Sequence, residues 1–275
     1  MRLIDSHGHL QAEAFAADLD LVVAAARDAG LERILVPGWD RASSEAALRL
    51  ASERPWLDAA VGIHPHVAAA VDDAGWAWFG SAARDERVVA IGETGLDFDR
   101  LHSPAEAQLA NLRRHLRLGL ETGRPAILHC RSAPGRRDAQ DALIDELRRA
   151  GHGGPVAAAA FGDRPPAVLH SFSGPADYAA AALDLGLAIS ISGLAFRRGE
   201  EATAEVARRV PAGRLLVETD SPYLSPPGGP RRRNAPEWVR LTARWVAGLR
   251  AEPDGAFGAA LVAAYDRTFP RPRPR

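Results

Sequence analysis

The sequence predicts an α/β protein built as a TIM-like (β/α)8 barrel, with room for some distortion, and with a metal site at the C-terminal face of the strands. Short apolar runs of β type alternate with helix-like stretches along the chain. Histidine or carboxylate residues directly follow several of these runs. The length of 275 residues is common for a single barrel of this kind.

The expected strands are short runs of apolar and β-branched residues, separated by stretches rich in alanine, leucine, arginine and glutamate. This alternation is typical of a parallel sheet with crossover helices. The eight predicted strands are Leu3–His7, Arg33–Val36, Ala59–His64, Val88–Glu93, Ala126–Cys130, Ala167–Ser171, Leu187–Ser192 and Arg214–Thr219.

Several helices carry local start and stop signals. We expect Ser103 to cap a helix that ends before Gly123, and Asn234 to cap a second helix that starts near Pro236. Residues 151–166 contain glycines, an alanine run and a proline pair, and they are expected to form a loop insertion before the sixth strand.

No strong linker divides the chain, so residues 1–269 are predicted to form one domain, followed by a disordered Pro/Arg-rich tail over residues 270–275. A hydrophobic content of 47% is sufficient for a full core. The net charge of −1 provides no global field that attracts polyanions. A nucleic-acid substrate would therefore have to be held by a local basic patch.

The cellular context follows from what the chain lacks. Cys130 is the only cysteine, which excludes an internal disulfide framework and a cysteine-rich zinc site. No signal peptide and no apolar run long enough for a membrane helix is present. We therefore expect a soluble cytoplasmic protein without a membrane partner, with a monomer favoured.

All 34 basic residues are arginine. The absence of lysine excludes Schiff-base catalysis, a lysine general base, a P-loop lysine and a carbamylated lysine that bridges two metals. Any bridging ligand must therefore be a carboxylate or a solvent molecule.

The first strand ends in Asp5-Ser6-His7-Gly8-His9. Histidines at positions i and i+2 lie on the same face of an extended chain, so both imidazoles can reach one ion. Taken alone, such a pair is more often two polar residues at a strand end than a metal site.

Four other strands end in residues that can bind metal. Glu93, His129, His170 and Asp220 each follow an apolar run. Each of them alone has an ordinary explanation, such as an arginine partner for Glu93 or a turn for Asp220. In a barrel, however, all these strand ends meet on one face. Cys130 follows His129 with its side chain on the opposite face and is expected to be an ordinary buried thiol.

The predicted metal ligands are His7, His9, Glu93, His129, His170 and Asp220. Oxygen and imidazole ligands together suit Zn²⁺, Mn²⁺, Fe²⁺ or Co²⁺, and Mg²⁺ less obviously. A glutamate such as Glu93 can bridge two divalent ions. Two ions hold a hydroxide and stabilise the attacking and leaving oxygens of a phosphodiester.

The motifs together resemble the TatD family of metal-dependent deoxyribonucleases, within the amidohydrolase-like barrels. The resemblance runs from Leu3 to about Trp245, and its order and spacing are specific. Its segments are Asp5–Leu10, Val61–His66 (VGIHPH), Ala90–Asp97 (AIGETGLD), Leu128–Arg131, His170–Gly174 and Leu216–Asn234.

The resemblance implies a barrel hydrolase with two divalent ions (Mg²⁺, Mn²⁺ or Zn²⁺) that cleaves DNA phosphodiester bonds, typically from a 3′ end. It implies that His7, His9, Glu93 and Asp220 hold one ion and that Glu93, His129 and His170 hold the second. Glu93 and Asp220 are the implied catalytic residues, because they would organise the attacking water.

The resemblance also implies three substrate-binding residues. His64 and Arg131 are expected to hold the scissile phosphate. Arg233, followed by Asn234, fits the family's Arg-Asn pair, which braces the loop of the site. Arg231–Arg233 would provide a local basic patch, although solvated arginines in an arginine-only protein explain them equally well.

Three departures from the family pattern leave the substrate open. Gln11 replaces the usual aspartate, Ala-Pro follows Asn234 in place of Glu-Pro, and residues 151–166 are longer than expected. The alternative is a bimetal amidohydrolase-like enzyme that acts on a small-molecule ester, lactone or amide, since the same ligands also suit attack on carbonyl carbon. A non-catalytic scaffold would have no need for so many convergent ligands.

Overall fold

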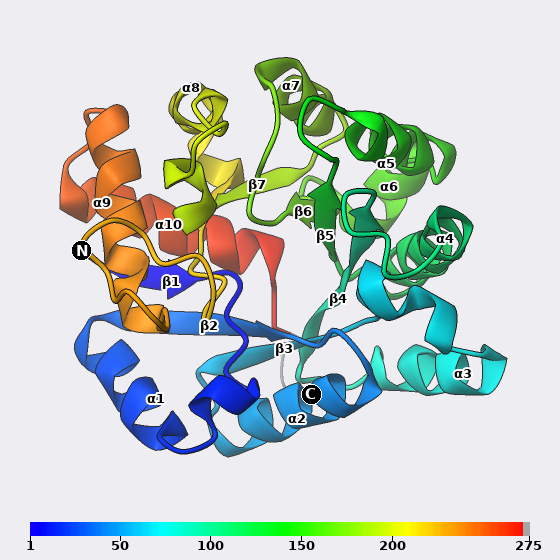
Figure 1. Ribbon diagram of the computed structural model, residues 1–275, viewed down its shortest axis with the longest axis horizontal. Coiled ribbons are helices and arrows are strands. Elements are labelled where there is room, and N and C mark those ends of the chain that lie inside the picture. Colours follow the sequence, from blue (N-terminus) through cyan, green and yellow to red (C-terminus); the bar gives the residue numbers. More distant parts are fainter. Residues whose placement is uncertain (272–275) are drawn as a thin grey trace.

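The computed structural model, which describes residues 1–271, is a (β/α)8 barrel (Figure 1). Eight parallel strands follow one another in chain order around a single sheet, as the sequence predicts. The strands are β1 (Leu3–Asp5), β2 (Leu31–Pro37), β3 (Leu57–Val61), β4 (Val88–Asp97), β5 (Ala126–Arg131), β6 (Ala167–Leu169), β7 (Ala188–Ile191) and β8 (Leu215–Val217).

The sheet closes between β1 and the chain that leaves β8. The amide of Ser6 donates to the carbonyl of Val217 at 3.1 Å, and the amide of Asp220 donates to the carbonyl of His7 at 2.9 Å. The buried carboxylate of Asp5 accepts hydrogen bonds from the amide and the hydroxyl of Thr219. Side chains and backbone thus join the two ends of the barrel where a regular strand ladder is missing.

The helices lie outside the barrel (Figure 1). They are α1 (Leu19–Asp28), α2 (Arg41–Glu53), α3 (Asp73–Ala82), α4 (Ala105–Thr122), α5 (Asp138–Arg149), α6 (Pro155–Phe161), α7 (Ala176–Asp184), α8 (Ala202–Arg209), α9 (Val239–Leu249) and α10 (Asp254–Thr268). Short 3-10 turns are η1 (Glu13–Phe15), η2 (Pro65–Ala70), η3 (Gly193–Phe196), η4 (Ala212–Arg214) and η5 (Pro236–Trp238).

The helix α4 shows how the sequence specifies these outer elements. Leu112 and Leu116, four residues apart, share the face that packs on the barrel, and both are almost fully buried. Burial of each leucine contributes about 1.5–3 kcal/mol of hydrophobic stabilisation. Gly123 ends the helix in a left-handed conformation with φ of 64°, as predicted.

Both predicted helix caps are wrong. The Ser103 hydroxyl accepts from the amide of Ala69 and donates to the carbonyl of His66, so it joins η2 to the start of α4. The Asn234 side chain donates to the carbonyl of Thr219 at 2.9 Å. Both side chains therefore bond to segments distant in sequence, which local cap signals cannot reveal.

The expected loop over residues 151–166 is also wrong in part, because α6 lies within it. Pro155 opens this helix at its first turn, where a missing amide proton costs nothing, and the alanine run continues it. The flanking glycines and prolines limit the helix to seven residues.

The far end of the barrel is covered by α10. The Tyr265 hydroxyl donates to Asp58, a buried residue of β3, at 2.8 Å. Of the predicted tail, residues 272–275 lie outside the described residues, whereas Arg271 donates to the same Asp58 carboxylate at 2.9 Å. Among the described helices, none is both long enough and apolar enough to cross a membrane. The C-terminal ends of the strands are left as the open face.

Candidate metal centre

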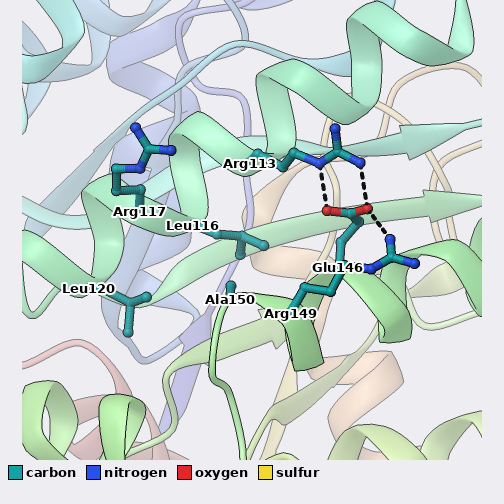
Figure 2. A pocket seen from close by; sticks show the side chains of 7 residues that line it. All are labelled: Arg113, Leu116, Arg117, Leu120, Glu146, Arg149 and Ala150. Carbon is teal, nitrogen blue, oxygen red and sulfur yellow. Dashed lines mark hydrogen bonds and ion pairs between the residues drawn. The ribbon is translucent and has the colours of Figure 1, made fainter.

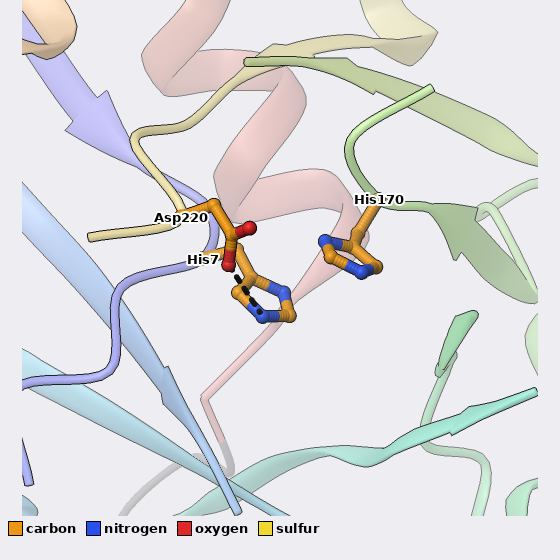
Figure 3. Close-up of side chains that lie close together, drawn as sticks. All are labelled: His7, His170 and Asp220. Carbon is orange, nitrogen blue, oxygen red and sulfur yellow. Dashed lines mark ion pairs between the residues drawn. The ribbon is translucent and has the colours of Figure 1, made fainter. Parts of the chain in front are cut away.

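All six side chains predicted as metal ligands meet at the C-terminal end of the barrel. His7 and His9 follow β1, Glu93 lies within β4, and His129 lies within β5. His170 follows β6 and Asp220 follows β8. Figure 3 shows three of them, His7, His170 and Asp220, pointing toward one another from separate segments. All six side chains are at most one-fifth exposed.

The first group of donor atoms consists of His7 Nε2, His9 Nε2, Glu93 Oε2 and Asp220 Oδ1. The two imidazole nitrogens are 3.2 Å apart. Glu93 Oε2 lies 3.3 Å from His7 Nε2 and 3.7 Å from His9 Nε2. Asp220 Oδ1 lies 3.8 Å from His7 Nε2 and 3.4 Å from His9 Nε2. The four atoms therefore surround one point.

This spacing fits a metal ion. Donors about 2.0–2.2 Å from one ion lie roughly 3.0–3.6 Å apart in tetrahedral or octahedral geometry. A neutral imidazole has one lone-pair nitrogen, so two such nitrogens at 3.2 Å have no favourable interaction unless a proton or a cation lies between them. The Nδ1 atoms of His7 and His9 have no hydrogen-bond partner among the described residues, which leaves Nε2 as the functional end of both rings.

A second group of donors surrounds the other oxygen of the same glutamate. Glu93 Oε1 lies 3.0 Å from His170 Nε2, 3.2 Å from His129 Nδ1 and 3.3 Å from His64 Nε2. His129 and His170 were predicted here, whereas His64 was predicted as a phosphate contact. The structure brings His64 to the same carboxylate oxygen, in a group with the spacing of metal ligands.

The protonation states of His64 and Glu93 favour metal binding. Burial lowers the pKa of His64 to about 4, so its imidazole is neutral at pH 7 with a free lone pair. Burial alone would raise the pKa of Glu93, but the surrounding His170, His64 and His7 hold the pKa of this carboxyl well below its ordinary value. Glu93 is therefore an anion with one oxygen toward each histidine group.

A further carboxylate, Glu218, supports the second group. It is fully buried, and its Oε1 atom accepts a hydrogen bond from the amide of Ser171 at 2.6 Å and lies 3.2 Å from His170 Nδ1. Sequence reasoning missed Glu218, although it shows the same signal as Glu93, a carboxylate directly after an apolar strand.

Asp97 is a second buried carboxylate that was missed. Its Oδ2 atom lies 2.7 Å from His66 Nε2 and 3.5 Å from His129 Nε2. The Asp97 carboxylate also accepts hydrogen bonds from the amides of Asp99 and Arg100. It is thereby held in place at the outer side of the His129 ring. The signal for it was present in the Gly-Glu-Thr-Gly-Leu-Asp run.

Arg131 and Arg233, the two arginines predicted to bind the substrate, lie in different parts of the structure. Arg131 ends β5 at the rim, 47% exposed, and its Nε atom lies 2.7 Å from Asp99 Oδ2. Arg233 makes two hydrogen bonds to Asp18, donates to the carbonyl of Ala14 and stacks over the ring of Phe15. These contacts tie the loop after β8 to the segment after β1 and occupy the guanidinium of Arg233.

Cys130 takes no part in either group. Burial raises the pKa of its thiol to about 12, so the thiolate that would bind a metal is absent at neutral pH. This agrees with the expected ordinary thiol.

A family model matches nearly the whole chain. The model of the family described as TatD related DNase matches residues 4–270. The chain belongs to the TatD family. The family resemblance seen in the sequence motifs is thereby confirmed.

Relatives and solved structures of the TatD family cover almost the same length. The chain is 33% identical to the uncharacterized metal-dependent hydrolase YabD of Bacillus subtilis, over 90% of this chain and 91% of YabD. It is 37% identical to the 3′-5′ ssDNA/RNA exonuclease TatD of Erwinia billingiae, over 98% and 100% of the two chains. The crystal structure of the TatD homologue YJJV from Escherichia coli superposes with a TM-score of 0.85, at 30% identity and over 98% and 99% of the two chains.

Proposed function

We propose that this chain is a divalent-metal-dependent hydrolase that cleaves phosphodiester bonds of nucleic acid, as a deoxyribonuclease of the 3′–5′ exonuclease type. The observation that carries the proposal is the arrangement of histidines on both oxygens of Glu93. Two groups of donors on one carboxylate favour two ions, with Mg²⁺, Mn²⁺ and Zn²⁺ as candidates. The named activity of the Erwinia billingiae relative supports nucleic acid as the substrate.

The residues divide into two ligand groups in this proposal. His7, His9 and Asp220 would hold the first ion, and His129 and His170 would hold the second, with Glu93 as a ligand that could serve both. His64 joins the second group, since its Nε2 atom lies 3.3 Å from Glu93 Oε1, close to the 3.2 Å of His129 Nδ1. A pair of such ions lowers the pKa of bound water and neutralises charge on the phosphoryl group.

The protein supplies the remaining steps. Asp220 accepts the proton of the attacking water, because its carboxylate borders the first group and remains partly open to solvent. Arg131 reaches the substrate phosphate from the rim, in exchange for its exposed pairing with Asp99. Glu218 keeps His170 in the orientation that directs Nε2 toward Glu93.

Metal analysis combined with a cleavage assay tests the proposal. Purified protein is expected to contain divalent metal and to shorten a 5′-labelled single-stranded DNA stepwise when Mg²⁺ or Mn²⁺ is added, while a 3′-labelled copy releases its label at once. EDTA, Glu93→Ala and Asp220→Asn should each abolish shortening. Glu45→Gln, a surface change on α2, should not affect it.

The outcomes separate the alternatives. Bound metal with hydrolysis of a small ester or lactone, but with intact DNA, would favour the small-molecule hydrolase. Absence of both metal and hydrolysis in fresh protein would contradict the catalytic proposal.

A further inference from the structure

A cleft of about 510 Å³ is formed by two segments that follow β7 and β8. Its walls are the end of η3 and the loop that follows β8, and its volume lies in the range of ligand pockets, about 300–1,000 Å³. The lining residues are Phe196, Arg197, Ser225, Pro226, Pro227, Gly228, Gly229, Pro230 and Arg231. The lining thus has two arginines and no carboxylate.

One wall of the cleft starts at a candidate ligand, and the other starts at a residue bonded to the neighbour of a candidate ligand. The loop after β8 begins with Asp220, whose carbonyl accepts the amide of Tyr223 at 2.8 Å. The other wall begins after Ser192, whose hydroxyl accepts that of Ser171, the neighbour of His170. The walls touch at Gly193, where even a Cβ atom would lie 1.7 Å from the carbonyl oxygen of Leu224. The cleft is therefore fixed relative to the candidate ligands.

The arginines of the cleft differ from most arginines of this chain. Arg197, Arg198, Arg231 and Arg232 are exposed, and no carboxylate pairs with any of them within residues 1–271. In contrast, Arg208 and Arg209 of the following helix α8 both pair with Glu205. The acidic residues closest in sequence are already engaged, since Glu200 accepts the hydroxyl of Ser173 and Glu201 accepts the amide of Gly199.

A second groove lined by arginines differs in how many of these side chains are paired with a carboxylate. Between α4 and α5, Arg113 and Arg149 share the single carboxylate of Glu146, so that two of the three arginines lining this groove are engaged in ion pairs within the protein (Figure 2). The guanidinium groups of Arg197 and Arg231, by contrast, have no carboxylate partner among the described residues and are available to bind an anionic ligand. Guanidinium groups bind phosphate oxygens through two parallel hydrogen bonds.

An aromatic residue lies near His9 on the loop that leads from Asp220 to the cleft. Tyr223 is 59% exposed, and its ring centroid lies 6.1 Å from that of His9. An unpaired base can stack on such a ring, whereas the faces of paired bases are covered within the duplex. Positive charge along a backbone path together with an exposed aromatic ring is the usual pattern of single-strand binding.

We propose that this cleft binds the phosphodiester backbone of a single-stranded nucleic acid, next to the nucleotide that enters the metal centre. Arg197 and Arg231 contact phosphates, and Tyr223 stacks on a base. The inference rests on the proposed nuclease function and adds the path that the uncleaved part of the strand follows along the protein.

Binding measurements test the cleft directly. The probe is a fluorescein-labelled phosphorothioate strand of 12 nucleotides, which keeps the backbone charge and resists hydrolysis, and the readout is fluorescence anisotropy of metal-loaded protein at several salt concentrations. Arg197→Ala combined with Arg231→Ala is expected to raise Kd about tenfold. Loss of two phosphate contacts should reduce the slope of log K against log salt by about 1.4, since each contact to a single strand contributes about 0.7.

A matched control removes the same charge elsewhere. Arg49 of α2 and Arg117 of α4 are also exposed and without an ion pair among the described residues. Arg49→Ala combined with Arg117→Ala should leave Kd within twofold and the salt slope unchanged. Arg197→Lys combined with Arg231→Lys should retain most of the slope, because it keeps the charge. A 12-base-pair duplex should bind the wild type more weakly than the single strand.

The outcomes distinguish this inference from the proposed function. If the wild type shortens natural single-stranded DNA but both alanine pairs bind the probe equally well, the cleft inference is wrong and the nuclease function remains. Preference for the duplex would overturn the single-strand assignment. A wild type that neither binds the probe nor cleaves DNA would overturn both.

Discussion

Glu218 lies directly behind His170, with its Oε1 atom 3.2 Å from the Nδ1 atom of that imidazole. The carboxylate is held by the amide of Ser171 and by the hydroxyl of Ser6. Burial would raise its pKa, but the hydrogen bond and charge of His170 lower it to about 2, so that Glu218 remains an anion. When His170 is neutral with its proton on Nδ1, the lone pair of Nε2 points toward Glu93 Oε1 at 3.0 Å.

Replacement of this anion should weaken metal binding. In Glu218→Gln we expect the affinity for Mn²⁺ or Zn²⁺ to fall about 10–100-fold, the usual effect of losing a partner behind a histidine ligand. Calorimetric titration of metal-stripped protein measures it. Glu200→Gln changes another carboxylate of the same face, bonded to Ser173, and should bind metal normally. Equal affinities in the two variants would contradict the positioning role of Glu218.

Removal of metal should lower the stability of the fold. Without a cation, the donor atoms of His7, His9, Glu93 and Asp220 are crowded within 3.2–3.8 Å of one another. A ligand that binds only the native state at 100 times its Kd stabilises it by about 2.7 kcal/mol. We therefore expect EDTA to lower the Tm of the wild type, and the Tm of Asp220→Asn to respond much less to added metal. An equal response in both proteins would argue against Asp220 as a ligand.

The ion pair between Arg233 and Asp18 allows a test of whether Arg233 braces the loop after β8 or contacts the substrate. If Arg233 braces the loop that carries Asp220, Arg233→Ala and Asp18→Ala remove the same interaction. Both variants, and the double variant, should then reduce kcat for DNA shortening to a similar extent and with little additivity. If Arg233→Ala alone raises KM while Asp18→Ala behaves like the wild type, Arg233 contacts the substrate as the family resemblance first implied.

His115 makes the fold sensitive to acid. It is fully buried in α4, where Nε2 accepts the amide of Ile63 at 3.0 Å and Nδ1 lies 2.8 Å from the carbonyl of Asn111. Burial lowers its pKa to about 4, below the value near 6.5 of the unfolded chain. Between these values the unfolded state binds more protons, so stability is present above pH 6.5 and is lost as the pH falls toward 4.

The contribution of His115 over this window is roughly 3 kcal/mol. We expect His115→Gln to be less stable than the wild type at pH 7 and to show a flatter dependence of the free energy of unfolding between pH 6.5 and 4. Urea titrations in EDTA at several pH values measure this slope, and an unchanged slope would exclude His115 as a source of the acid sensitivity.

The strands of the barrel could be predicted because each is a buried apolar run that ends in polar residues. The residues at which the strands end could not be predicted in the same way. The strand β6 stops at Leu169, although His170 and Ser171 were included, because Ser171 turns away with a positive φ of 41°. The strand β4 continues to Asp97, because Gly95 lets the backbone approach the carbonyl of His129 too closely for any side chain.

The ligand groups could be predicted in part from residue type and strand position. His64 shows the limit, since nothing in its local sequence distinguishes a group that contacts substrate from one that reaches Glu93. Ser103 and Asn234 show the same limit for structure, because their partners are distant in sequence. Glu218 was not predicted as part of the site, although it precedes Asp220 by only two residues. The structure shows that it is fully buried directly after β8 and is therefore not an ordinary surface carboxylate.

The seam between β1 and β8 brings Asp220 to His7 and His9, more than 200 residues away in the chain. During synthesis on the ribosome, His7 and His9 are made first, and more than 200 further residues are added before Asp220 is present. A chain released early, anywhere before residue 220, has no complete set of donors in the first group. The first group of donors is therefore completed only once the segment after β8 has been synthesised.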